Sequence, residues 1–232
     1  MTLAKLSQLI AVAQMANMSL AYAMPQQSAT SSAKINYPFD YSSLVCPEAS
    51  TEPKATLITP TYGSSGTVFT VCAALQIFAR ASQIRDAILD FDSYGRWNTF
   101  IPSVTLPENV TITPDDDFPN MSMTFTSSGL VDGANTTSTE ILTILDYFDV
   151  GQSGKPYLMV AWHYDDGLAG IGSRAEHPSV IVEEEDGSSW LLSYETYYVG
   201  TLTPVVELLK GRLQEQFEVQ AADLKAYVEG LS

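Results

Sequence analysis

The chain has 232 residues, 45% of them hydrophobic and 16% charged, and a formal net charge of −16. This length and composition support one large or two small globular domains and exclude global disorder. The negative charge disfavours nucleic acid and anionic membrane surfaces as partners. No apolar run reaches the roughly 18 residues that a membrane span requires.

The N-terminus has the features of a secretory signal peptide. Lys5 is followed by an apolar stretch, Leu6–Leu20, and Ala21-Tyr22-Ala23 provides a small-x-small cleavage site. The alternative is an ordinary N-terminal helix. We therefore expect a signal peptide at residues 1–23, an extended arm at 24–66 and a folded domain at 67–232, in a protein that is secreted or enters the secretory pathway.

Two further features fit that compartment. Beyond the signal the chain has two cysteines, Cys46 and Cys72, which an oxidising compartment would pair, joining the arm to the first strand. Two buried free thiols are the alternative. Three Asn-x-Ser/Thr motifs, at Asn109, Asn120 and Asn135, indicate one glycan-bearing side.

The domain begins with a strand and two short helices. Thr67–Ala79 is β-branched and aromatic, Ser82 is a good helix N-cap, and Asp92–Asn98 is a second helix or turn before Pro102. A series of strands follows at Val104–Thr111, Ser122–Ser128, Thr139–Asp146, Tyr157–Tyr164, Ala175–Glu184 and Ser189–Val199. Asp186-Gly187 predicts a two-residue hairpin turn between the last two strands.

The chain ends in a long amphipathic helix with Pro204 in its first turn. Its apolar residues recur at helical spacing: Val206, Leu209, Leu213, Phe217, Leu224, Val228 and Leu231. Runs of strands without alternating helices argue against a parallel nucleotide-binding sheet. The fold class is therefore α+β, with a curved antiparallel sheet of about seven strands and the long C-terminal helix packed over it.

This order of elements resembles the START-like superfamily, also called SRPBCC or helix-grip proteins, and in particular its small fungal polyketide cyclase/dehydrase-like members. The matching residues are Ser82–Ile84, Leu89–Tyr94, Trp97, Pro102, Val160–Trp162, Ala175-Glu176, Tyr194–Thr196, Gly200, Leu224-Lys225 and Glu229. The resemblance covers Thr67–Ser232. It implies an apolar cavity between sheet and helix, in a family whose members bind lipids, sterols, quinones or polyketides, and some of which catalyse cyclisation, dehydration or isomerisation.

The residue types and their spacing do not indicate a metal or cofactor site. The chain has only two histidines, His163 and His177, and no cysteine pair at ligand spacing, so we expect no metal and no cofactor. Gly167–Gly172 is read as a loop, because its glycine order differs from that of a phosphate-binding loop.

Alternation along the strands sorts the remaining candidates. In the last strand the bulkier set is Trp190, Leu192, Tyr194, Thr196 and Tyr198, and in Tyr157–Tyr164 it is Leu158, Val160, Trp162 and Tyr164. We place both sets toward the cavity. That choice turns His163 and Glu195 outward, as surface residues rather than a catalytic pair.

The candidate catalytic residues are then Tyr164, Tyr194 and His177, because a phenol can polarise a carbonyl and an imidazole can act as a general base. The candidate ligand contacts are Trp97, Phe100, Trp162, Tyr198, Leu209, Leu213 and Phe217. Ordinary core packing is the alternative for all of these. Three functions stay open: a carrier of an apolar polyketide-, terpenoid- or lipid-like molecule in secondary metabolism, a cofactor-independent cyclase, dehydratase or isomerase, and a secreted interaction protein. The oligomeric state stays open too.

Overall fold

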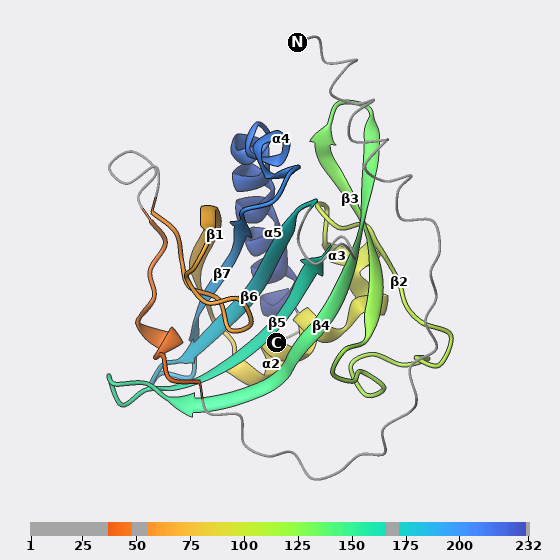
Figure 1. Ribbon diagram of the computed structural model, residues 1–232. Helices are drawn as coiled ribbons and strands as arrows, with labels where there is room; N and C mark the ends of the chain where they lie inside the picture. The colour runs from red at the N-terminus through yellow and green to blue at the C-terminus, as the bar shows by residue number, and fades with distance from the viewer. Residues whose placement is uncertain (1–36, 48–54, 166–171, 231–232) are drawn as a thin grey trace. The chain divides into compact units, whose positions relative to one another are not determined.

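An antiparallel sheet dominates the computed structural model, and its strands follow the order β1-β7-β6-β5-β4-β3-β2 (Figure 1). The strands are β1 (Thr67–Ile77), β2 (Ser103–Thr105), β3 (Ser122–Val131), β4 (Ala134–Val150), β5 (Pro156–Asp165), β6 (Arg174–Glu183) and β7 (Ser189–Tyr198). The structure describes residues 37–47, 55–165 and 172–230. The predicted signal peptide, the arm before residue 37, most of the Gly167–Gly172 loop and Leu231 lie outside these ranges.

Short helices connect β1 to β2. They are α2 (Ala81–Leu89), the 3-10 turn η2 (Phe91–Ser93) and α3 (Tyr94–Trp97). α2 begins one residue before Ser82, and its N-cap position is Arg80, whose backbone N–H donates to the Gln83 side chain at 3.1 Å. Ile84 and Ile88 are buried on the inner side of α2, as the helical spacing predicts.

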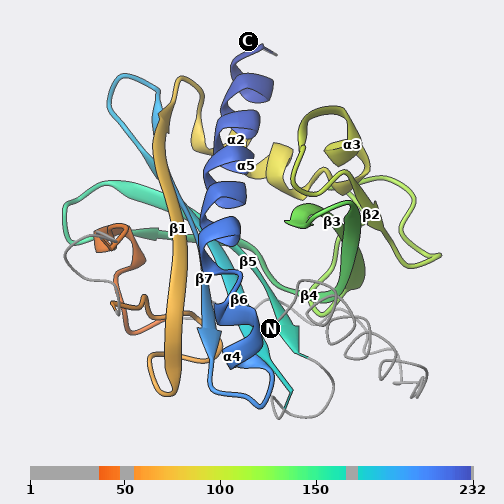
Figure 2. The same cartoon turned by 90° about the horizontal axis from the view of Figure 1, so that it is seen from above.

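The long C-terminal helix packs on one face of the sheet, alongside β1 and β7 (Figure 2). It is divided into α4 (Thr203–Glu207) and α5 (Lys210–Gly230), with exposed Leu208 between them. The buried residues of α5 are Leu213, Phe217, Gln220, Ala221, Leu224 and Val228. The predicted stripe is therefore the face that packs on the sheet, and we call the sheet face beneath it the inner face.

Two strands differ most from their predicted bounds, and the others differ by one to three residues at an end. The prediction of Val104–Thr111 is wrong, because pairing ends at Thr105 and the side chain of Asp116 then binds the N–H groups of Thr111 and Ile112 in a turn. β4 is nine residues longer than the predicted Thr139–Asp146, since its polar start pairs with β3 in a hairpin. A hairpin between β6 and β7 is confirmed, with Gly187 in the left-handed region (φ 81). Its loop is longer than the predicted two residues, because the Glu184 N–H bonds the Ser188 carbonyl and leaves three residues between them.

The described part of the arm covers the opposite face of the sheet, which we call the outer face. Residues from Phe39 onward belong to the same compact unit as the sheet. Cys46 and Cys72 form a disulfide, as predicted, with their Cα atoms 5.6 Å apart. The backbone around Ile58 and Gly63 accepts hydrogen bonds from the Tyr194 and Tyr198 hydroxyls, both at 2.7 Å. β7 is consequently buried on both faces.

Within the described ranges, no helix is long and apolar enough to cross a membrane.

Candidate functional site

The inner face under α5 brings together side chains from neighbouring strands at matching register. Trp162 on β5 lies opposite His177 on β6, and Ser179 lies opposite Ser193 on β7. In the other direction along β6 from His177, Tyr164 lies opposite Ala175, which lies opposite Tyr197. These rows divide the inner face into two zones, an aromatic deep end and a polar end.

The aromatic deep end is closely packed. The His177 ring lies 4.6 Å from the Trp162 ring and 4.8 Å from the Phe217 ring, centroid to centroid. Its Nε2 is 2.8 Å from the Ser193 hydroxyl. Burial lowers the pKa of His177 to about 3, because a charged imidazolium would lose its hydration. His177 is therefore neutral at physiological pH.

A small cavity of about 20 Å³ remains beside this cluster, lined by residues that include Trp97, His177, Ser193 and Gln220. That volume suits about one water molecule. Two lining residues have buried polar atoms that find no hydrogen-bond partner in the described part of the chain, Nε1 of Trp97 and Oε1 of Gln220. The deep end therefore has room for a small polar group, and a larger ligand needs space elsewhere on the inner face.

The polar end holds two glutamates and two phenols around the small side chain of Ala175. We call Glu140, Tyr164, Glu195 and Tyr197 the acidic niche. Glu140 lies opposite Tyr164 in the β4–β5 ladder, and the Tyr197 hydroxyl donates to Oε2 of Glu195 at 2.7 Å. Tyr164 and Glu195 keep some accessible surface.

Both carboxyls of the niche titrate far from their usual range. Burial raises the pKa of Glu195 to about 7, and the hydrogen bond from Tyr197 opposes that rise. Burial, followed by the negative charge of Glu195, raises the pKa of Glu140 to about 8. Glu195 thus loses its proton first, and its charge then disfavours ionisation of Glu140. Groups with such pKa values can donate and accept protons near neutral pH.

Most of the predicted site residues lie on the inner face. Buried in the core beneath α5 are Trp97, Phe100, Trp162, His177, Leu213 and Phe217, while Leu209 packs at its margin. Tyr164 lies in the acidic niche. The predicted outward direction of His163 is confirmed, since its ring lies 5.4 Å from Tyr62 of the arm. The catalytic and ligand-binding roles of these residues stay predictions.

The predicted direction of β7 is wrong. Tyr194 and Tyr198 point to the outer face and bind the arm, while Glu195 points to the inner face. Alternation failed because the arm buries the outer face as well, so that both residue sets of β7 are bulky and mostly buried. Tyr194 and Tyr198 are therefore not placed to contact a ligand under α5.

Sequence reasoning missed Glu140, Tyr197 and Ser193. Glu140 carries a signal in hindsight, because it is the charged member of an otherwise apolar alternation with Leu142 and Ile144, all three buried. A charged residue in phase with core positions indicates either a paired charge or a functional group. Tyr197 and Ser193 had no such signal once β7 was assigned the opposite direction.

The other described surfaces give weaker evidence for a binding site. An open groove of about 720 Å³ runs between β1 and α5, but the backbone of Cys72 along it is already bonded to the Gln214 side chain. Among the described residues, no group of three or more His, Cys, Asp or Glu side chains could hold a metal ion. Asn109, Asn120 and Asn135 are all exposed, and their glycosylation stays a prediction.

Comparisons with known proteins support the fold. No family model matches the chain. A hypothetical protein of Helicobacter pylori superposes with a TM-score of 0.55 at 13% identity, covering 75% of this chain and 97% of that protein. The chain has the helix-grip fold. The expected START-like architecture, with its curled antiparallel sheet and long C-terminal helix, is thereby confirmed.

Some of the structural neighbours are enzymes by name. A Streptomyces aromatase/cyclase superposes with a TM-score of 0.50 at 11% identity, over 69% of this chain and 93% of the enzyme. A norcoclaurine synthase of Thalictrum flavum superposes with a TM-score of 0.50 at 14% identity, over 72% of this chain and 98% of the enzyme. At such identities the likeness concerns the fold alone.

One relative is found by sequence. It is named oxopyrrolidines biosynthesis cluster protein O, from Penicillium oxalicum, and it is 25% identical over 189 residues, which span 75% of this chain and 93% of that protein.

Proposed function

We propose that this protein binds an apolar small molecule between α5 and the inner face of the sheet, in a pathway of secondary metabolism. The observation that carries the proposal is the pairing of an aromatic deep end with a polar niche on the face that α5 covers. A mostly apolar lining with a few convergent polar groups is typical of small-molecule sites. The named role of the Penicillium relative in a biosynthesis cluster supports the metabolic context.

An enzyme on the same fold is the second candidate. The acidic niche favours it, because two carboxyls with pKa values of about 7 and 8 could transfer protons during a cyclisation, dehydration or isomerisation. Tyr164 and Tyr197 would then orient or polarise the reacting group, and the aromatic deep end would hold the substrate in place. Such chemistry requires only the side chains of this chain and its substrate.

Secretion belongs to the proposal as well. The predicted signal peptide, the Cys46–Cys72 disulfide and the exposed Asn-x-Ser/Thr motifs fit an oxidising, glycosylating compartment. Mass analysis of protein purified from its native source tests this proposal, which expects a chain that starts at Met24 and carries glycans. A native chain that retains residues 1–23 would contradict it.

The binding proposal is tested with an apolar fluorescent dye and a substitution that fills the inner face. Leu213 is 4% exposed and lies on the α5 face that packs on the sheet. We expect Leu213→Trp to abolish dye binding, at a stability cost of about 1–3 kcal/mol from overpacking. Val219→Trp is the matched control, because Val219 is 40% exposed on the same helix.

The control variant should bind dye like the unmodified protein. If the unmodified protein binds no dye and Leu213→Trp only lowers the melting temperature, the inner face is an ordinary core and the proposal fails.

A further inference from the structure

The acidic niche is unusual because its charges have the same sign. Glu140 is 5% exposed, and its Oε2 has no hydrogen-bond partner among the described residues. Its other interactions are a hydrogen bond with Ser138 and repulsion from Glu195. A buried carboxylate without a cation is costly, and proteins usually neutralise it by a partner or by protonation. Among the described residues, no positive group is one of the groups that shift the pKa of either carboxyl.

The surrounding elements do not supply that group within the described contacts. The charged and titratable groups nearby are Lys210 and Arg212 of α5, Arg174, Glu176 and His177 of β6, and the two phenols of the niche. Arg212 is bonded to Asp132 in the β3–β4 hairpin, and Arg174 lies over the Tyr62 ring on the outer face. Lys210 lies over the Phe69 ring and is not among the groups that shift the pKa of Glu140 or Glu195. His177 is neutral, and Glu176 is bonded to the arm.

The aromatic rings of the niche also suit a cation. The Tyr197 ring stacks on Phe69 with centroids 4.4 Å apart. The ammonium group of Lys210 already lies 5.7 Å from the Phe69 centroid. Aromatic faces attract ammonium groups, most strongly where water is excluded. Carboxylates beside such faces form the usual environment of a bound amine.

We infer that the acidic niche binds the basic nitrogen of an amine whose apolar part lies along α5. This inference rests on the proposed function and narrows its ligand class. Glu140 and Glu195 would accept hydrogen bonds from the ammonium group, while Tyr164 and Tyr197 would flank it. An anionic lipid or fatty acid is disfavoured, because its carboxylate would meet two further carboxyls.

Proton release gives the inference a signature of its own. Near pH 7 the two free carboxyls together hold more than one proton, whereas an ammonium group stabilises their ionised forms. Binding of an amine should therefore release about one proton per ligand near pH 7. A neutral ligand in the same place would release none.

The test uses three probes with the same alkyl chain: dodecylamine, dodecanol and dodecanoate, each below its micelle concentration. Calorimetric titration in two buffers of different ionisation enthalpy measures both affinity and proton release. We expect the amine to bind at least about tenfold more tightly than the alcohol, because a charge-assisted hydrogen bond replaces a neutral one. The carboxylate should bind most weakly.

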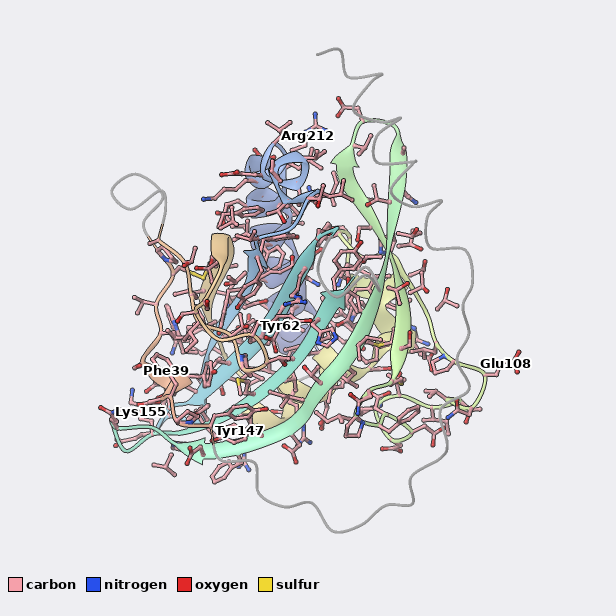
Figure 3. All side chains as sticks on the ribbon, in the orientation of Figure 1. Phe39, Tyr62, Glu108, Tyr147, Lys155 and Arg212 are labelled. Carbon is pink, nitrogen blue, oxygen red and sulfur yellow. A yellow bond between two sulfur atoms is a disulfide. The ribbon has the colours of Figure 1, made fainter. Side chains whose placement is uncertain are left out.

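Glu140→Gln and Glu195→Gln should each remove most of the amine preference and reduce the proton release, while the affinity for dodecanol stays within about twofold. Glu108→Gln is the matched control, because it removes the same charge from an exposed loop that projects from the molecule (Figure 3). That variant should behave like the unmodified protein.

Equal binding of amine and alcohol without proton release would overturn the inference and leave the proposed function standing. Failure of all three probes to bind would contradict both. Since proton release is measured on the unmodified protein, the test does not depend on whether the variants fold.

Discussion

The two faces of the sheet each bury glutamates, and these glutamates differ in how they are satisfied. On the outer face, Glu176 accepts hydrogen bonds from the backbone N–H groups of Thr61 at 2.9 Å and 3.1 Å and from Tyr62 at 3.3 Å. On the inner face, Glu195 accepts one hydrogen bond, from the Tyr197 hydroxyl. Oε2 of Glu140 accepts no hydrogen bond from the described residues. Glu176 thus links β6 to the arm, whereas the described hydrogen bonds of Glu195 and Glu140 link no separate segments.

Hydrogen bonding distinguishes a structural glutamate from a candidate functional one more clearly than burial does. All three glutamates lie within packed regions, and burial raises the pKa of each. Buried polar groups in folded proteins are normally satisfied, so the unsatisfied ones require an explanation. On the outer face the explanation is the arm. On the inner face, the explanation that we propose is a ligand.

The largest effect should come from releasing the arm. Replacing both Cys46 and Cys72 with serine removes a cross-link that spans 26 residues. We expect a loss of about 3 kcal/mol in the free energy of unfolding, measured by urea denaturation. Dye binding on the inner face should not change. Loss of dye binding in the folded variant would show that the two faces are not independent.

A smaller loss should follow from changing the outer carboxylate. In Glu176→Gln the new amide group places N–H donors against the N–H groups of Thr61 and Tyr62, which leaves buried donors unsatisfied. We expect a cost of about 2 kcal/mol in the free energy of unfolding. Glu195→Gln is the inner counterpart and should cost much less at pH 8, where it removes a buried charge. Equal losses in the free energy of unfolding of the two variants would show that the outer and inner glutamates do not differ in their structural role.

The pH dependence of stability sharpens the comparison. Glu140 and Glu195 have raised pKa values in the folded protein, about 8 and 7 against 4.5 when unfolded, so the folded state binds more protons between these limits. Their stabilising contribution is complete below pH 4.5 and is lost as the pH rises toward 8. His177, with its lowered pKa, acts in the opposite direction between pH 6.5 and 3.

The window from pH 6.5 to 8 therefore isolates the carboxyls of the inner face from His177. We expect the unmodified protein to lose about 2 kcal/mol more than Glu140→Gln/Glu195→Gln across this window, by chemical denaturation at each pH. Asp117, whose pKa burial raises to about 7, adds the same slope to both proteins and cancels in the difference. Identical slopes would mean that the carboxyls are solvated.

The element order was predictable because each element carries a local signal. The period of α5, the turn at Asp186-Gly187 and the β-branched strands all follow from neighbouring residues. The direction of β7 was not predictable in the same way. It depends on the contact of Ile58 and Gly63 with a strand more than a hundred residues away along the chain, and this contact buries the face that alternation assigned to the cavity.

The site shows the same limit. Trp162, His177 and Phe217 were found because large or titratable residues on a core face attract attention. Glu140 was missed because a lone glutamate in a strand is usually solvated, and Glu195 was placed outward because the direction of β7 was predicted wrongly. Only the tertiary structure shows that β4 and β7 turn these glutamates to the same face. The acidic niche is assembled by the curl of the sheet across four strands rather than by any local motif.

The smallest expected effect comes from two tyrosines of β7. Tyr194 was predicted to face the cavity but points outward, and Tyr197 points inward in its place. Tyr194→Phe removes a hydroxyl that donates to the Ile58 carbonyl at 2.7 Å, leaving a buried acceptor unsatisfied, and should cost about 1 kcal/mol without changing ligand binding. Tyr197→Phe removes the hydrogen bond that holds down the pKa of Glu195. Its main expected effect is an upward shift in that pKa, visible by NMR titration of the labelled glutamate carboxyl, and weaker amine binding. A Tyr194→Phe variant that shifts the Glu195 titration instead would place both phenols on one face and refute the assignment of inner and outer sides.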